Sequence, residues 1–109
     1  MPNRIADEQV RLIREYVQSH LTERVSVRQI ADALGRNASY LNTFYSTQTG
    51  ENITGYIHRC KVCRAEQLLR ETNRSLAEIC ASLGFFDQSH FSRVFKAQTG
   101  MTPGAYRKK

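Results

Sequence analysis

Polar side chains that can read base pairs share one face of a segment near the end of the chain. If residues from about 87 to 99 form a helix, one side of it carries Ser89, Ser92, Arg93 and Lys96, and Gln88 lies in its exposed first turn. Arginine can donate two hydrogen bonds to O6 and N7 of guanine, and glutamine can pair with N6 and N7 of adenine. Three residues on the opposite side are apolar and are expected to be core: Phe91, Val94 and Phe95. We therefore predict that this helix contacts bases through Gln88, Ser89 and Arg93.

The same pattern occurs twice, because residues 26–57 are similar to residues 75–107. At an offset of 49, the recurring residues are Ser26, Ile30, Leu34 and Gly35, matched by Ser75, Ile79, Leu83 and Gly84. At an offset of 50, they are Ser39, Gln48, Thr49, Gly50 and Tyr56, matched by Ser89, Gln98, Thr99, Gly100 and Tyr106. One residue inserted after the glycine reconciles the two offsets. Each repeat reads as a short apolar helix, a glycine turn and a longer helix, which is the pattern of a helix-turn-helix.

The longer helix of the first repeat, expected over about residues 38–49, presents a weaker reading face. Its expected buried residues are Leu41, Phe44 and Tyr45. Its predicted base contacts are Ser39, Asn42 and Thr43, none of which is charged. Asn42 can pair with adenine and Thr43 can meet a thymine methyl group, so this helix is expected to contribute less than the second one.

Contacts with the DNA backbone need donors at the edges of these helices rather than base-reading geometry. The residues predicted for this role are Arg28, Arg36, Ser46, Arg59, Lys61, Arg74, His90, Ser92 and Lys96, with Arg107 to Lys109 as further candidates. Each of these cations can equally be a solubilising surface residue, and His90 can equally lie at the edge of the core. Arg11, Arg14 and Arg24 lie among acidic residues and are interpreted as surface residues.

The composition agrees with a small DNA-binding protein. The chain has 109 residues, 40% of them hydrophobic, which suffices for one compact domain or two small lobes but not for a large enzyme. Its net charge of +6 favours a polyanionic partner. No apolar run approaches the ~18 residues of a membrane span, and the first residues lack the apolar core of a secretion signal. We expect a cytoplasmic protein with reduced cysteines.

Helical periodicity runs through the chain and predicts an all-α fold. Apolar residues recur at three- and four-residue steps from about Asp7 to Leu21, which indicates an amphipathic first helix. Ser26 and Ser75 stand directly before apolar patterns, where a serine oxygen can cap the first turn of a helix. Gly35 and Gly84 are expected to end those two helices, because glycine adopts positive φ without steric cost.

The segment between the repeats, from about Asn52 to Thr72, lacks proline and is expected to be a linker helix. A helix of ~20 residues is ~30 Å long, and successive major grooves repeat at ~34 Å on one face of DNA. A linker of this length could therefore place the two longer helices in adjacent grooves. After the second repeat's long helix, Thr102 and Pro103 predict a last short helix.

Cys60 and Cys63 form a Cys-x-x-Cys pair, which is compatible with a zinc site or a redox switch. A tetrahedral zinc site needs two further ligands, and the sequence has neither a second such pair nor two closely spaced histidines. Both cysteines are therefore interpreted as small, partly buried residues, and Cys80 as core. Paired catalytic carboxylates, a phosphate-binding glycine loop and a Ser/His/Asp arrangement are not evident, so we expect no catalysis, cofactor or metal.

The run AEICASLGFFDQSHFSRVFKAQTGMTPGAYR, residues 77–107, closely resembles the carboxy-terminal signature of the AraC/XylS transcriptional regulators. The first repeat fits as well, through ASYLNTFYSTQTG followed by GYI, and Ala65, Leu68 and Leu69 match the family's linker helix. The resemblance implies about seven helices in two helix-turn-helix lobes joined by a long linker helix. It also implies binding to an asymmetric promoter site, near which RNA polymerase is recruited or blocked.

The resemblance further implies residue roles and boundaries. Gln88, Ser89 and Arg93 match base-contacting positions of the family, whereas Thr43 and Ser46 stand where many members carry basic residues. Residues 1–109 are expected to be one DNA-binding domain, with lobe one at about 7–51, the linker at about 52–72 and lobe two at about 74–107. Many relatives add an amino-terminal sensor and dimerisation domain, so this segment is expected to be monomeric, with any dimerisation through such a domain.

Two other functions are compatible with this composition. The chain could be a helical adaptor that docks proteins through apolar patches, or a nonspecific nucleic-acid binder. Promoter binding weakens steeply with salt and survives excess competitor DNA. An adaptor would lack that salt response, and a nonspecific binder would lack a preferred duplex.

Overall fold

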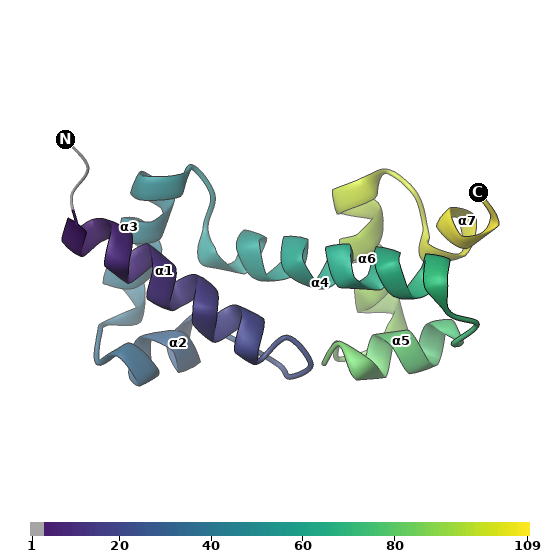
Figure 1. The fold of residues 1–109 in the computed structure, drawn as a ribbon, viewed down its shortest axis with the longest axis horizontal. Coiled ribbons are helices and arrows are strands. Elements are labelled where there is room, and N and C mark those ends of the chain that lie inside the picture. Colours follow the sequence, from purple (N-terminus) through teal and green to yellow (C-terminus); the bar gives the residue numbers. More distant parts are fainter. Residues whose placement is uncertain (1–3) are drawn as a thin grey trace. The chain divides into compact units, whose positions relative to one another are not determined.

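The computed structural model describes residues 4–109, which form seven helices and no strand (Figure 1). The helices are α1 (Arg4–Ser19), α2 (Val27–Leu34), α3 (Ala38–Thr49), α4 (Ile53–Glu71), α5 (Leu76–Ser82), α6 (Gln88–Thr99) and α7 (Pro103–Lys108). The all-α fold is therefore confirmed, although α1 begins and ends slightly earlier than its apolar pattern predicted. None of the helices in residues 4–109 has both the length and the apolar character needed to cross a membrane.

The two helix-turn-helix motifs begin with matching caps. Ser26 accepts from the amide of Gln29, whose side chain accepts in return from the Ser26 amide. Ser75 and Glu78 make the same reciprocal pair at the start of α5. These bonds occupy amides that a helix leaves unpaired in its first turn, so the predicted serine caps are confirmed.

Each motif turns at a glycine in the left-handed region. Gly35 has φ +67° after α2, and Gly84 has φ +70° after α5. Other residue types rarely adopt this conformation, so the glycines explain why the two short helices end where they do. The longer helices then begin with Asn37 and Asp87 as N-caps, at equivalent places in the two repeats.

The described chain divides into two compact units. Unit 1 comprises the residues up to His20 together with Val25–Ile57, and unit 2 comprises Leu21–Arg24 together with His58–Lys109. Unit 1 thus contains α1, α2, α3 and the first turn of α4. Unit 2 contains the rest of α4, the helices α5 to α7, and four residues of the loop between α1 and α2.

The core of unit 1 gathers apolar residues from four helices. Its buried residues include Ile13 and Val17 of α1, Ile30 and Ala31 of α2, Leu41 and Tyr45 of α3, and Ile53 and Tyr56 of α4. The two buried tyrosines have polar partners, because Arg14 Nε donates to the Tyr45 hydroxyl at 3.1 Å and Gln18 Nε2 donates to the Tyr56 hydroxyl at 3.2 Å. One side of α1 is therefore fixed against α3 and the start of α4.

The core of unit 2 packs the linker helix against the second motif. It contains Val62, Ala65, Leu68 and Leu69 of α4, Ile79 and Cys80 of α5, Leu83 and Phe85 of the turn, and Phe91, Val94 and Phe95 of α6. The aromatic rings interlock, with centroids 5.0 Å apart between Phe85 and Phe91 and 5.9 Å apart between Phe91 and Phe95. This packing fixes which side of α6 faces solvent.

Candidate nucleic-acid interface

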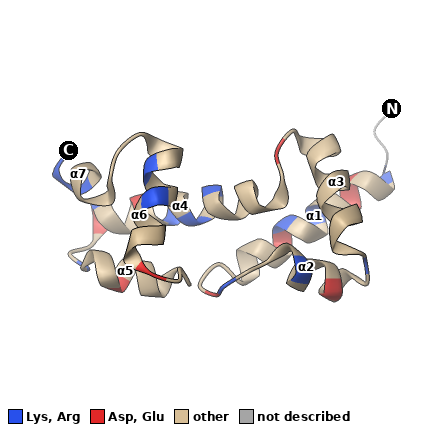
Figure 2. Cartoon of the chain, turned by 180° about the vertical axis from the view of Figure 1, so that it is seen from behind, with Lys and Arg blue, Asp and Glu red and all other residues tan. Residues whose placement is uncertain are grey.

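The outward face of α6 carries the residues predicted to read bases. Phe91, Val94 and Phe95 are buried as expected, and Gln88, Ser89, Arg93 and Lys96 are exposed. Asp87 fixes the first turn by accepting from the His90 amide at 2.7 Å. Figure 2 shows the basic residues of this helix in blue. The predicted buried side of α6 is confirmed, and the base contacts on the other side stay a prediction.

The outward face of α3 has a different character. Ser39 and Thr43 are exposed, and Leu41 and Tyr45 are buried. Phe44 is only half-buried, so the prediction that it belongs to the core is partly wrong. Its ring stacks instead on Tyr40, at a centroid distance of 6.2 Å, and Tyr40 is itself 54% exposed. This face is therefore uncharged and partly aromatic.

Asn42, a predicted base contact on α3, has a structural role. It is half-buried, and its Oδ1 accepts from the amide of Ile53, the first residue of α4, at 3.1 Å. The equivalent pair in the second repeat is Ser92 and Pro103. Proline has no amide hydrogen, so no acceptor is needed there. Asn42 thus binds the start of α4 through its Oδ1, and its base contact stays a prediction.

Several predicted backbone contacts have the exposure that this role requires. Exposed side chains belong to Arg28, Arg36, Arg59, Arg74 and Lys96, and half-buried ones to Ser46 and Ser92. Arg36 also donates to Gln9 at 3.2 Å, so its guanidinium is held beside α1. Contacts of these residues with phosphate stay predictions.

The prediction that Lys61 contacts the DNA backbone is wrong. Its side chain is buried, at 4% exposure. Its Nζ donates to the carbonyls of Leu21 and Glu23 at 2.7 Å each and to the carbonyl of Leu83. Burial lowers the pKa of Lys61 to about 8, against an opposing effect of Glu23. An ammonium with three internal acceptors and almost no surface cannot reach a phosphate.

Arg107, a further candidate for a contact with the DNA backbone, makes hydrogen bonds within unit 2 instead. Its guanidinium donates to the carbonyls of Leu69 at 3.4 Å and Thr72 at 3.2 Å, at the end of α4. Carbonyls at a helix end lack partners within the helix, so Arg107 satisfies two of them and ties α7 to α4. Arg70 reinforces this contact by donating to the Tyr106 hydroxyl at 2.7 Å.

His90 lies at the edge of the unit 2 core. Its ring meets Phe85 and His58 at centroid distances of 5.6 and 6.0 Å, and its buried Nδ1 has no hydrogen-bond partner in the described part of the chain. Burial, followed by the nearby His90 and Lys61, lowers the pKa of His58. These contacts favour the core-edge interpretation of His90, and its contact with phosphate stays a prediction.

The three cysteines are free thiols. Cys80 is buried as predicted, and burial, together with Asp87, raises its pKa. Cys60 is half-buried and Cys63 is exposed. Within residues 4–109, no group of three His, Cys, Asp or Glu side chains is arranged to hold a metal ion.

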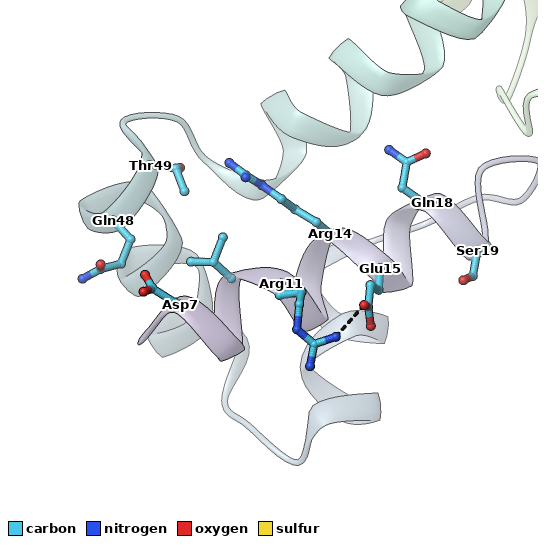
Figure 3. Close-up of a pocket in the computed structure, with 9 residues that line it drawn as sticks. Asp7, Arg11, Arg14, Glu15, Gln18, Ser19, Gln48 and Thr49 are labelled. Atoms are coloured by element: carbon cyan, nitrogen blue, oxygen red, sulfur yellow. Dashed lines mark hydrogen bonds and ion pairs between the residues drawn. The ribbon is translucent and has the colours of Figure 1, made fainter. Parts of the chain in front are cut away.

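A groove of about 700 Å³ lies in unit 1 along α1 and the end of α3 (Figure 3). Figure 3 shows Arg14 extending from α1 toward Thr49, while Arg11 reaches Glu15 along the same helix. The Arg14 guanidinium lies over the rings of Tyr45 and Tyr56, 5.9 and 5.5 Å from their centroids. Both arginines therefore have partners within unit 1, and the groove is lined by residues outside the predicted reading faces.

The contact made by Arg24 has no signal in the sequence. Its guanidinium lies over the ring of Phe86, 4.9 Å from the centroid. Phe86 directly precedes the N-cap of α6 and is 70% exposed. Because the two residues are 62 positions apart, no local pattern could have paired them.

Comparisons with known proteins agree with this architecture. A family model described as a helix-turn-helix domain matches residues 30–109. The uncharacterized HTH-type transcriptional regulator YobQ of Bacillus subtilis is 34% identical over 92 residues, which are 84% of this chain and 38% of YobQ. AdaA of the same organism, a bifunctional transcriptional activator/DNA repair enzyme, is 28% identical over 100 residues, which are 92% of this chain and 47% of AdaA. The chain thus spans less than half the length of both curated relatives.

A solved structure gives the same result in three dimensions. The C-terminal domain of AraT, a response regulator from Geobacillus stearothermophilus, matches with a TM-score of 0.88 and 27% identity. The match covers 92% of this chain and 84% of that one. Together with the two helix-turn-helix motifs, α2–α3 and α5–α6, these similarities show that the chain belongs to the AraC/XylS family of DNA-binding transcription regulators.

Proposed function

We propose that residues 1–109 form one sequence-specific domain that binds double-stranded promoter DNA and places α3 and α6 in two successive segments of the major groove. The observation that carries the proposal is the division of α6 into two sides. Its aromatic side is buried in unit 2, and its other side exposes Gln88, Ser89 and Arg93. These side-chain types can distinguish base pairs by hydrogen bonds in the major groove.

The two reading helices contribute unequally in this proposal. α6 has the exposed cations Arg93 and Lys96, whereas α3 has no charged residue at all. Reading by α3 through Ser39, Asn42 and Thr43 then depends more on shape and water, so mismatches facing α3 should be tolerated better. The helix α4 is the linker, and lobe one at about 7–51 and lobe two at about 74–107 are the two readers.

The bound regulator then recruits or blocks RNA polymerase. This segment acts as a monomer in the cytoplasm, and any dimerisation uses a further domain. It works by binding rather than by catalysis. AdaA is named as a DNA repair enzyme as well as an activator, but the match covers only 47% of AdaA and overlaps the residues that the helix-turn-helix family model matches.

Replacing Arg93 with alanine tests this function. Duplexes bound by the wild-type chain are first selected from a randomised pool, and affinities are then measured on the preferred site and on single-base variants. Arg93→Ala should weaken binding to the preferred site by about 5- to 150-fold, corresponding to the ~1–3 kcal/mol of a lost bidentate base contact. Preference at one base pair should relax at the same time.

Lys96→Ala serves as the contrast, because it removes an exposed cation from the same helix at a predicted phosphate contact. Its loss should be similar on every duplex. An equal loss for Arg93→Ala on all sequences would make Arg93 a phosphate contact only. If the pool yields no preferred duplex, the proposed function is wrong.

A further inference from the structure

Four residues of the loop between α1 and α2 belong to unit 2. Lys61 holds them there, because its ammonium donates to the carbonyls of Leu21 and Glu23 as well as to that of Leu83. Leu83 is the C-cap of α5 and directly precedes Gly84 in the turn of the second helix-turn-helix. A single buried side chain thus joins the loop Leu21–Arg24 to the turn that leads into α6.

Gly84 brings the same loop into close contact with that turn. A Cβ atom at this position would lie 2.5 Å from the carbonyl oxygen of Glu23 and 2.9 Å from the amide nitrogen of Arg24. Such distances are well inside van der Waals contact, so only glycine leaves room for the loop backbone. Two independent features, the Lys61 hydrogen bonds and the glycine contact, therefore hold the backbone of Glu23 and Arg24 beside residues 83 and 84.

These two contacts of the loop backbone place the Arg24 side chain beside Phe86. Its guanidinium lies 4.9 Å from the centroid of the exposed Phe86 ring. In the alignment of the repeats at an offset of 50, Phe86 stands where the first repeat has Arg36, and each directly precedes the N-cap of the longer helix. The turn of the second motif thus has Phe86 where the first has an arginine, and the Arg24 guanidinium lies beside that ring.

We propose that Arg24 binds a backbone phosphate of the DNA segment read by α6, positioned for this contact by Phe86 and by the loop that Lys61 holds. The inference rests on the proposed function, which assigns no role to Arg24. A guanidinium held over an aromatic ring can still donate from its N–H groups to two oxygens of one phosphodiester. The stacking also reduces the freedom that the side chain must lose on binding.

Arg24→Gln tests the inference through the salt dependence of binding. Affinities are measured on the selected duplex and its single-base variants over a range of salt concentrations. Loss of one phosphate contact should make the negative slope of log K against log salt shallower by about 1. Affinity should fall by a similar factor, about threefold to tenfold, on every duplex, with base preferences unchanged.

The matched control is Arg11→Gln, which removes the same charge from an exposed arginine of α1 that pairs with Glu8 and Glu15. It should leave the salt slope unchanged. Phe86→Leu should give a smaller loss than Arg24→Gln, and combining the two changes should add nothing to Arg24→Gln, because the ring acts only through the guanidinium.

Three outcomes would overturn the inference. If Arg24→Gln reduces the salt slope no more than Arg11→Gln does, Arg24 does not contact the DNA backbone. Independent losses from Arg24→Gln and Phe86→Leu would show that the ring does not position the guanidinium. A wild-type chain without any preferred duplex would overturn the proposed function, and the inference with it.

Discussion

Changing Gly84 to alanine is expected to lower the free energy of unfolding of unit 2 by about 3 kcal/mol, the sum of two effects. Positive φ costs a residue with a Cβ atom about 1–2 kcal/mol, and forcing an atom into occupied space costs about 1–3 kcal/mol more. Gly84 has φ +70°, and its Cβ would overlap the backbone of Glu23. Urea denaturation followed by far-UV circular dichroism measures the change.

The two repeats provide a control for this prediction. Gly35 occupies the equivalent turn of the first motif with φ +67°, but a Cβ there would meet nothing within 4 Å. Gly35→Ala should therefore show only the conformational cost of about 1–2 kcal/mol. If both variants lose the same stability, the close approach of Glu23 contributes nothing. Hydrogen exchange should show faster opening of α5 and α6 in Gly84→Ala alone.

Replacing Lys61 with methionine is expected to destabilise unit 2 by about 1–3 kcal/mol, since buried carbonyls lose their donor. Methionine keeps the aliphatic stem, so the change isolates the hydrogen bonds to Leu21, Glu23 and Leu83. The matched control is Arg64→Met, which removes an exposed cation three residues further along α4 that donates to Gln67 at 2.8 Å. Equal unfolding midpoints for the two variants would contradict the structural role of Lys61.

The pH dependence of stability in the wild type and in Lys61→Met tests the role of Lys61 a second time. The pKa of Lys61 in the folded chain is about 8, below its ordinary value of 10.5. Between these values the unfolded chain binds the proton more tightly, so this group makes stability rise with pH from about 8 to 10.5. Lys61→Met lacks that contribution. The difference in unfolding free energy between wild type and Lys61→Met should therefore widen over this window, and a constant difference would contradict the lowered pKa.

Features encoded by local sequence could be predicted, and contacts between distant segments could not. The caps Ser26 and Ser75 and the turns at Gly35 and Gly84 follow from the preferences of single residues at helix ends, and the repetition supports each of them twice. The buried side of α6 follows from helical periodicity. The base contacts on its other side come from the same argument, and they stay predictions because no DNA contact has tested them.

Lys61 shows why contacts between distant segments could not be predicted from the sequence. Arg59 and Arg64 lie close to it in the sequence, a pattern that indicates an exposed basic cluster. Its burial depends on carbonyls 40 and 38 residues earlier in the chain and 22 residues later. The same applies to Arg107, whose acceptors lie 38 and 35 residues away. A cation that satisfies distant carbonyls has no periodic signature of its own.

The loop Leu21–Arg24 lies between α1 and α2 in the chain but belongs to unit 2, which limits how the protein can be divided into fragments. A truncated fragment that starts within α4 would retain every helix of the second motif, yet it would omit two of the three oxygens that accept from Lys61. It would also leave the space beside Gly84 empty. The carboxy-terminal half is therefore not an autonomous module that a cut after the first repeat could release intact, and swapping halves between relatives would have to carry these four residues along.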